Sequence, residues 1–300
     1  MTAGAARRAS ALPALARLAT SLVVVATALG LLAAGAVAAT LHRADVRPPY
    51  AHDGLLVVLV IGSDIGMPYR SGDPLRGRAD GLHLLAVDTE ARAATIVNIP
   101  RDTLAGGTKI NAHLAFGGPE RQVSAVEDYT GIPIDHYALT TFRGIEEMTR
   151  ILGGVEVEVE RRMVDRFSGS NLHPGRQTLD GEQSLAFVRD RNSHPDGDFG
   201  RTRTHGLFMR SVHEQVVSRH NDLRDLTYLT AHFARTTVTD IPADQLLPLA
   251  LLATQIDPAD VHQEALSGSF GTTSGGASIV HLQSGDAFER IRRGEVGPPR

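Results

Sequence analysis

An uncharged stretch of 24 residues, 18–41, restricts this chain more than any other feature of its sequence. As a helix it would be about 36 Å long at about 1.5 Å per residue, which is enough to cross a bilayer with some tilt. Three arginines precede it, and the first acidic residue of the chain is Asp45, so the positive-inside rule places the N-terminus in the cytoplasm. We therefore predict a single-pass protein of the cell membrane, with a cytoplasmic tail at 1–17, a transmembrane signal anchor at 18–41, a tether at 42–54 and an extracytoplasmic domain at 55–295.

A cleaved signal peptide is the alternative interpretation of the same stretch. Ala36, Val37 and Ala38 give the small-x-small pattern that signal peptidases accept. The uncharged run is longer than the usual apolar region of a signal peptide, which favours the anchor. Both interpretations export the remainder of the chain, so the compartment of the domain does not depend on the choice.

The composition excludes several classes of site. The chain has no cysteine, and therefore no disulfide, no zinc-thiolate site, no iron-sulfur cluster and no thiol nucleophile. A net charge of −4, from 30 basic and 34 acidic residues, argues against a nucleic-acid partner. Any metal or nucleophilic chemistry must then depend on oxygen and nitrogen atoms.

Apolar runs at 55–61, 82–87 and 95–99 are typical of strands that are buried on both faces. Helical periodicity alternates with them and follows them along the chain. We expect helices at 121–129, 142–152, 181–189, 202–217, 222–235, 243–254 and 286–293, and a glycine- and serine-rich turn at 268–278. The pattern predicts one α/β domain in which a central mixed β-sheet is sandwiched by helices.

Charged residues gather where the predicted strands begin or end. Asp64 follows the first strand, Arg78 and Asp80 precede the second, and Arg101 and Asp102 follow the third. The crevice beyond the ends of such strands is the usual ligand site of an open α/β sheet. Further arginines border the helices at 181–189 and 202–217: Arg189, Arg191, Arg201 and Arg203.

Two explanations of this set remain open. Pairs such as Arg78–Asp80, Arg189–Asp190 and Arg201–Asp198 could be surface ion pairs worth about 0–1 kcal/mol each. Alternatively, the arginines form a cationic pocket for a phosphorylated ligand, since guanidinium groups match phosphate oxygens bidentately. Asp64 and Asp80 would then suit a Mg²⁺ ion, or Mn²⁺ in its place, held together with ligand phosphates. That combination is the chemistry of phosphoryl transfer.

Eight stretches of the chain form a recognisable series: VLVIGSD, RADGLHLLAVD, TIVNIPRDT, KINAHLAFGGPE, VEDYTGIPIDHY, LGGVEVEV, LDGEQSLAFVRDR and DGDFGRTR. Taken together and in this order, they resemble the LytR-CpsA-Psr family of bacterial cell-wall glycopolymer ligases. The resemblance covers residues from about 55 to 218. It implies a Mg²⁺-dependent phosphotransferase that moves a glycopolymer of the teichoic acid, capsule or arabinogalactan type from a polyprenyl-pyrophosphate carrier to a peptidoglycan acceptor.

The resemblance also implies roles for individual residues. Pyrophosphate binding falls on Arg78, Arg101, Arg189, Arg191 and Arg201, with Arg203, His205 and Lys109 as further contacts; Lys109 lies in the KIN motif. The metal-binding acids fall on Asp64 and Asp80, as the chemistry alone also suggested. Arg101 is a catalytic candidate. The base that activates the acceptor hydroxyl stays open between Asp102 and Asp198, and Asp102 could equally be a structural partner of Arg101.

The chain departs from the family's pattern at two of these motifs. Gly81 stands where the family usually has Thr, and His205 where it usually has Gln. Two other functions therefore remain: a hydrolase of polyprenyl pyrophosphate, in which water replaces the acceptor, and a non-catalytic lipid-pyrophosphate sensor or scaffold. A polyprenyl tail would need an apolar groove, for which the helices around Phe142 and Phe208 are the candidates, although such side chains can equally be plain core.

Overall fold

The computed structural model describes residues 54–65, 72–264 and 266–298, which all belong to one unit of the chain, Val46–Arg300. The predicted cytoplasmic tail, the transmembrane anchor and nearly all of the tether lie outside the described residues. Among the helices that are described, none has the length and apolar character needed to cross a bilayer.

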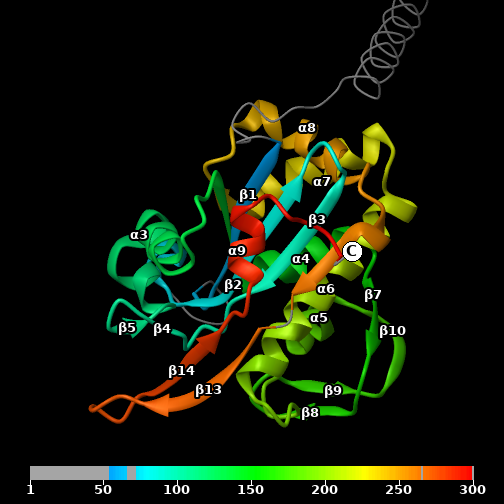
Figure 1. The fold of residues 1–300 in the computed structure, drawn as a ribbon. Helices are drawn as coiled ribbons and strands as arrows, with labels where there is room; N and C mark the ends of the chain where they lie inside the picture. The colour runs from blue at the N-terminus through cyan, green and yellow to red at the C-terminus, as the bar shows by residue number, and fades with distance from the viewer. Residues whose placement is uncertain (1–53, 66–71, 265, 299–300) are drawn as a thin grey trace, which may run out of the picture. The chain divides into compact units, whose positions relative to one another are not determined.

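Six strands form a central sheet in the order β11-β6-β1-β2-β3-β12. Figure 1 shows three of them, β1, β2 and β3, in the middle of the domain. They are β1 (Leu55–Ser63), β2 (Ala79–Asp88), β3 (Ala93–Asn98), β6 (His136–Thr141), β11 (Thr237–Thr239) and β12 (Val261–Glu264). The pairs β1–β6 and β3–β12 are parallel, and β1–β2, β2–β3 and β6–β11 are antiparallel. The predicted α/β fold with a central mixed sheet is therefore confirmed, and the first three strands lie where the apolar runs predicted them.

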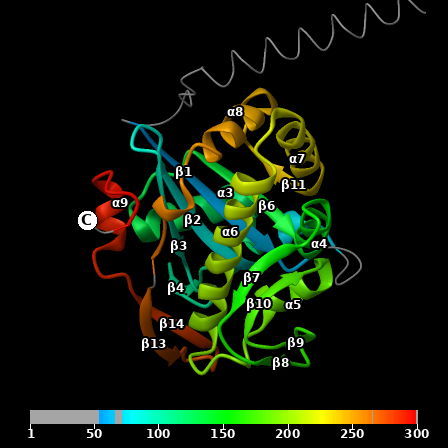
Figure 2. The ribbon, with the colours of Figure 1, turned by 90° about the vertical axis from the view of Figure 1, so that its right-hand side faces the viewer.

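Helices cover both faces of this sheet, as Figure 2 shows with α9 on one side and α6 on the other. They are α3 (Ala112–Thr130), α4 (Phe142–Ile151), α5 (Gly181–Arg189), α6 (Asp198–Arg219), α7 (Leu223–Thr236), α8 (Ala243–Ala253) and α9 (Ala287–Arg292). Alternate side chains of β1 point to opposite faces. Val57 and Leu59 join the core under α3 and α9, whereas Leu56 and Val58 join the core under α6, α7 and α8. The continuous apolar run of β1 follows from this double burial.

A smaller lobe stands beside the sheet. It contains the strand pairs β7 (Val155–Val159) with β10 (Gly175–Leu179) and β8 (Met163–Asp165) with β9 (Ser170–Leu172). Its apolar core, which includes Val157 and Phe187, also contacts α4, α5 and α6. The long helix α6 thus packs against both the central sheet and this lobe.

The structure changes two of the predicted elements. The helix expected at 121–129 begins earlier, at Ala112, because the chain turns through a kink at Gly118, with φ of 78°, and continues as a helix. The turn expected at 268–278 is wrong for most of its length. Residues Ser267–Thr272 form strand β13, which pairs with β14 (Ser278–Gln283), and the turn itself spans only the residues between them. Backbone hydrogen bonds to a partner strand outweigh the low strand propensity of glycine and serine there.

The remaining short elements join these parts. They are η1 (Pro74–Arg76), β4 (Leu104–Ala105), β5 (Thr108–Lys109) and η2 (Pro258–Asp260). The β13–β14 hairpin is attached to the loop after β3, because the Val280 amide donates to the carbonyl oxygen of Asp102 at 2.8 Å.

Candidate functional site

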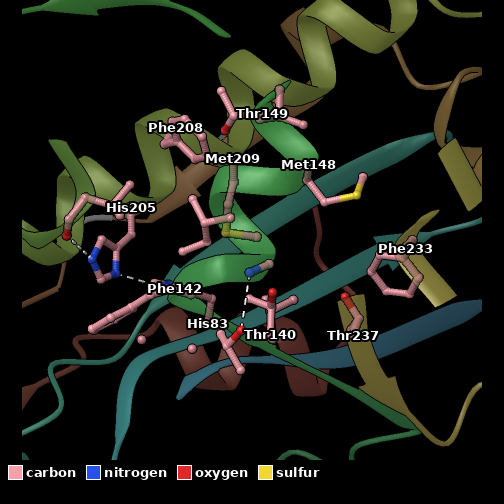
Figure 3. Close-up of a pocket in the computed structure, with 18 of the residues that line it drawn as sticks. His83, Thr140, Phe142, Met148, Thr149, His205, Phe208, Met209, Phe233 and Thr237 are labelled. Carbon is pink, nitrogen blue, oxygen red and sulfur yellow. Dashed lines mark hydrogen bonds between the residues drawn. The ribbon is translucent and has the colours of Figure 1, made fainter. Parts of the chain in front are cut away.

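A cavity of about 1060 Å³ lies between the central sheet and helices α4, α6, α7 and α8. Figure 3 shows His83 and His205 at one end of the view and Phe233 and Thr237 at the other. Charged side chains from β2, from the end of α5, from the start of α6 and from the segments that follow β1 and β3 line the first end. The elements that carry the predicted site residues therefore meet at one end of a single cavity.

Seven of the predicted site residues line this cavity: Asp64, Asp80, Arg101, Arg189, Arg191, Arg201 and His205. The other five are not among the lining residues: Arg78, Asp102, Lys109, Asp198 and Arg203. The roles assigned to all of them remain predictions. The structure decides only which side chains share the cavity and which stand behind it or point elsewhere.

A β-bulge directs Asp80 into the cavity. In the pairing of β1 with β2, Gly62 faces Gly81 and Ser63 faces Ala79, so Asp80 has no opposite residue. An extra residue in one strand turns its side chain away from the regular alternation. Both Asp80 and Gly81 consequently line the cavity, although neighbours in a regular strand point to opposite faces.

Asp80 and Arg101 form an ion pair, with 2.6 Å between Oδ2 and the guanidinium nitrogen. Burial acts to lower the pKa of Arg101, but the charges of Asp80, Asp198 and Asp102 outweigh it and raise the pKa. The other oxygen of Asp80, Oδ1, and the Nε of Arg101 are buried without a hydrogen-bond partner in the described part of the chain. The pair is therefore held in place by charge while one oxygen and one N–H remain for a ligand.

Arg201 and Asp198 form a second pair at the start of α6, with 2.6 Å between the guanidinium nitrogen and Oδ1. Asp198 is 0% exposed and Arg201 is 6% exposed, so this is no surface ion pair. Burial lowers the pKa of Arg201, and the positive charges of Arg101 and Arg191 act in the same direction, against the charge of Asp198. Several cationic groups thus face one cavity, an arrangement that is costly without an anion and typical of functional sites.

The C-terminal end of α5 supplies two more arginines. The helix starts with a capping box between Asp180 and Gln183, and it ends at Arg189. The Arg189 guanidinium lies 4.8 Å from the ring centroid of Phe142 and donates to the carbonyl oxygen of Phe167 at 3.3 Å. Arg191 lines the cavity two residues further on. Both cations stand at the negative end of the α5 dipole, which favours them there.

The remaining predicted residues hold the surrounding loops. Lys109 donates to Oδ1 of Asp102 at 3.0 Å, and Asp102 is buried but is not among the lining residues of the cavity. Arg203 pairs with Asp196 at 2.6 Å and is partly exposed. Residues two apart on a helix point to different sides, so Arg201 and Arg203 cannot both face the cavity from α6.

Arg78 contributes through its backbone. Its amide donates to Oδ1 of Asp64 at 2.7 Å, and the Asp64 amide donates to the Arg78 carbonyl at 3.1 Å. These two bonds join the end of β1 to the start of β2, and the ion pair expected between Arg78 and Asp80 is replaced by the pair between Asp80 and Arg101.

His83 belongs to the cavity wall and was missed by the sequence analysis. Its Nε2 lies 3.2 Å from Nδ1 of His205, and its Nδ1 lies 2.8 Å from the side-chain oxygen position of Asn98. Burial lowers its pKa from 6.5 to about 4, and the positive charge of Arg201 acts in the same direction. The signal that could have identified His83 was its position as a polar residue within the apolar run of β2.

The smaller lobe also contributes to the cavity wall. Asp165 and Phe167 line the cavity, and the sequence analysis did not predict them as site residues.

The other end of the cavity is apolar. Phe142 and Phe208, the two predicted markers of a groove, both line the cavity, and Figure 3 shows them on the side of His83 and His205, where the charged and apolar parts meet. Further apolar lining residues come from α4, α6, α7 and α8: Ile145, Met148, Met209, Val212, Leu226, Leu229, Phe233, Leu246 and Leu249. The cavity thus joins a cationic end to an apolar passage.

Asp64 and Asp80 fit a divalent cation in part. No group of three or more His, Asp or Glu side chains within the described ranges could hold a metal ion by itself. Mg²⁺ commonly takes only one or two protein carboxylates and completes its shell with water and phosphate oxygens. Two carboxylates that line the cavity, with the buried Oδ1 of Asp80 unpaired in the described region, supply that donor set.

The sequence model of the LytR_cpsA_psr family matches residues 34–293 of this chain. A polyisoprenyl-teichoic acid–peptidoglycan teichoic acid transferase, TagU of Enterococcus faecalis, is 30% identical over 200 residues, which cover 65% of this chain and 64% of TagU. The cell wall biosynthesis protein LcpA of Corynebacterium glutamicum is 31% identical over 213 residues, 56% of this chain and 41% of LcpA.

The chain therefore matches less than two thirds of the length of either relative. Among solved structures, the crystal structure of B. subtilis TagV has the same fold, with a TM-score of 0.69 over 81% of this chain and 96% of TagV at 22% identity. The match of the family model to most of the chain, and not this structural likeness alone, identifies the relationship: the chain belongs to the LytR_cpsA_psr family.

Proposed function

We propose that this protein transfers a glycopolymer from a polyprenyl-pyrophosphate carrier to peptidoglycan, with formation of a phosphodiester and release of polyprenyl phosphate. One observation carries the proposal: a single cavity has four arginines and the carboxylates of Asp64 and Asp80 at one end and an apolar passage at the other. A lipid pyrophosphate has the same division, with a highly charged head on a long apolar tail. The similarity to TagU, a polyisoprenyl-teichoic acid–peptidoglycan teichoic acid transferase, supports the same substrate class.

The proposed reaction moves negative charge onto the phosphate oxygens at the cationic end of the cavity. The acceptor hydroxyl oxygen attacks the phosphorus that carries the sugar, and the bond from that phosphorus to the bridging oxygen breaks. Polyprenyl phosphate leaves with the electron pair, and the hydroxyl proton passes to a base. Arg101, Arg189 and Arg201 offset the negative charge that builds on the phosphate oxygens, and fixed cations in a partly dry site stabilise such charge strongly.

The base is a separate proposal. Asp102 and Asp198 were the predicted candidates, but the Asp102 carboxylate is engaged by Lys109, and Asp198 is paired with Arg201 at 0% exposure. Either would have to receive the proton after a rearrangement of its ion pair. Both also serve as counter-charges that keep Arg101 and Arg201 in position.

Mg²⁺, or Mn²⁺, would be held by Asp64 and Asp80 together with the pyrophosphate oxygens. When bound, such an ion supplies positive charge at the leaving phosphate. Arg101 remains the group that holds Asp80 by charge, so loss of Arg101 would disturb the metal ligand as well as the anion site.

We further propose the cellular setting that the sequence suggests. Residues 18–41 anchor the protein in the cell membrane with residues 1–17 in the cytoplasm. The domain at 55–295 then acts outside the cytoplasm, where the lipid carrier and peptidoglycan are both accessible.

The test uses the full-length chain in detergent with a polyprenyl-pyrophosphate oligosaccharide, a peptidoglycan fragment, and either Mg²⁺ or EDTA. Mass spectrometry reads the products. The proposal expects a sugar-phosphate adduct on the acceptor in Mg²⁺, and a loss of at least about 100-fold in Arg101→Ala. Arg224→Ala is the matched control, because its side chain on α7 is 90% exposed.

Other products would identify the alternatives. Free oligosaccharide phosphate without an adduct would replace transfer by hydrolysis. Lipid binding that depends on Arg101, without turnover of several donors, would replace the enzyme by a sensor or scaffold.

A further inference from the structure

His205 occupies the meeting point of the four segments that carry the charged side chains. It lies on α6 one turn after Arg201, and its Nε2 is 2.5 Å from the carbonyl oxygen of Val188. Val188 is in the last turn of α5, where helix carbonyls have no partner within the helix. His205 therefore satisfies the end of α5 immediately before Arg189.

The direction of the hydrogen bonds around His205 can be deduced from chemistry. A carbonyl oxygen only accepts, so the Nε2 of His205 carries the hydrogen. Burial lowers the pKa of His205 well below 6.5, and the positive charge of Arg201 adds to the effect. The ring is thus neutral, and its Nδ1 accepts. The group 3.2 Å away, Nε2 of His83, must then be the donor.

The same reasoning fixes His83. A neutral ring that donates from Nε2 has a lone pair on Nδ1, and the atom 2.8 Å from that nitrogen must donate. The amide oxygen of Asn98 cannot do so, whereas its nitrogen can. In the orientation that the structure shows, the amide nitrogen of Asn98 is buried without a hydrogen-bond partner within the described ranges. Amide oxygen and nitrogen exchange by a half-turn, and a hydrogen-bond network is the proper criterion for choosing between them.

We propose that Asn98, His83 and His205 form a one-way hydrogen-bond relay, from the Asn98 amide through both rings to the Val188 carbonyl, that positions the arginines of the anion site. The relay connects β3, β2, α6 and the end of α5. These are the segments that carry or immediately precede Arg101, Asp80, Arg201 and Arg189. His83 and His205 are positioning residues in this proposal, which rests on the proposed function only for the identity of the anion.

Gly81 makes room for the relay. A Cβ atom at this position would lie 3.2 Å from Nε2 of His83 and 3.6 Å from Nδ1 of His205. The first distance is tighter than ordinary contact, so a side chain would press on the bond between the two rings. Gly81 and His205, the two departures from the family pattern, therefore adjoin each other in space.

The first test of the relay determines which ring nitrogen of His83 and of His205 carries the hydrogen. Full-length protein with ¹⁵N-labelled histidine is studied by NMR at neutral pH, and the two rings are assigned from the spectra of His83→Gln and His205→Gln. The expected result is that both rings are neutral with the hydrogen on Nε2. A His83 ring with its hydrogen on Nδ1, or a charged ring at either position, would overturn the relay.

The positioning role is tested by the binding of inorganic pyrophosphate, measured by calorimetry with Mg²⁺ present. His205→Leu should weaken binding about tenfold, because the Val188 carbonyl and the His83 ring both lose their partner. His205→Gln keeps a donor for Val188 and an acceptor for His83, and should bind within about twofold of the wild type. Gly81→Ala should weaken binding in the same direction as His205→Leu.

The outcomes separate this inference from the proposed function. Wild-type protein that binds pyrophosphate, together with His205→Leu that binds it equally well, would overturn the positioning role alone. Failure of His205→Gln to restore binding, while its fold is intact by circular dichroism, would also overturn it. If the wild type does not bind pyrophosphate, the proposed function and the positioning role both fail, and the NMR experiment still decides the relay.

Discussion

The two ion pairs near the start of α6, Arg201–Asp198 and Arg203–Asp196, differ in their burial. Both Arg201–Asp198 and Arg203–Asp196 join arginine to a nearby aspartate at 2.6 Å, but only the first pair is buried. A buried charge that loses its partner keeps its desolvation cost, whereas an exposed charge returns to water. The two pairs should therefore respond very differently to the loss of the arginine.

We expect Arg201→Ala to lower the free energy of unfolding by about 3–5 kcal/mol, since Asp198 is left charged and buried. Arg203→Ala should lower it by only about 0–1 kcal/mol. Urea denaturation of both variants measures the difference. Similar losses in the two variants would contradict the assignment of Arg201 as the buried partner.

The stability of the folded protein should depend on pH through His83. The pKa of its ring is 6.5 in a model peptide and about 4 in the folded protein, mainly because of burial. Between these values the unfolded chain binds a proton that the folded protein does not, so the free energy of unfolding falls as the pH is lowered. The full effect of this one group is on the order of 3 kcal/mol.

Urea denaturation between about pH 6.5 and pH 5 tests this dependence. In His83→Gln the slope of stability against pH should be smaller than in the wild type. His173→Gln, at an exposed position on the smaller lobe, is the control and should keep the wild-type slope. Equal slopes in all three proteins would show that His83 is not buried in its neutral form.

The N-terminal cap of α5 should affect the anion site at the other end of that helix. Asp180 caps α5 by accepting from the Gln183 amide at 2.9 Å, and Asp222 caps α7 by accepting from the Asp225 amide at 2.7 Å. Loss of either cap costs about 1 kcal/mol. Of these two helices, α5 ends in Arg189, which lines the charged end of the cavity, and α7 has no arginine in the cavity lining.

Asp180→Ala should therefore weaken pyrophosphate binding severalfold, while Asp222→Ala should leave it unchanged at a similar loss of stability. Calorimetry gives the binding constants, and thermal unfolding gives the stabilities. Equal binding by the two variants would mean that α5 is held by its tertiary contacts alone and that its cap does not influence Arg189.

The cavity has a charged end and an apolar passage, so a substitution in the apolar passage should weaken binding of a polyprenyl-pyrophosphate donor without weakening binding of inorganic pyrophosphate. Ala250 on α8 lines the apolar passage, whereas Ala231 on α7 is exposed. A tryptophan at position 250 would fill space that the lipid tail needs, but it would not reach the arginines. A tryptophan at position 231 would extend into solvent.

We expect Ala250→Trp to raise the KM for a polyprenyl-pyrophosphate donor at least tenfold and to leave the affinity for inorganic pyrophosphate unchanged. Ala231→Trp should change neither. Circular dichroism checks that the larger side chain has not unfolded α8, since overpacking can destabilise a core. Unchanged KM in a folded Ala250→Trp protein would place the lipid tail elsewhere.

Local sequence patterns were sufficient to predict the helices and strands whose buried residues recur at regular intervals. The apolar runs predicted β1, β2 and β3, and the helix at 181–189 has the bounds predicted for it, because strand burial and helix capping depend on neighbouring residues. The Arg and Asp motifs also identified six of the residues that line the charged end of the cavity. The transmembrane anchor stays a prediction, because residues 18–41 lie outside the described ones.

Tertiary structure decided the features that depend on residues far apart in the chain. The bulge that turns Asp80 into the cavity depends on the register with β1, and the strand at Ser267–Thr272 depends on its partner β14. His83 and His205 are 122 residues apart, and no local pattern reports their contact. Sequence periodicity records which side of an element is buried, whereas a polar contact between elements depends on how those elements are packed, and only the folded chain specifies that packing.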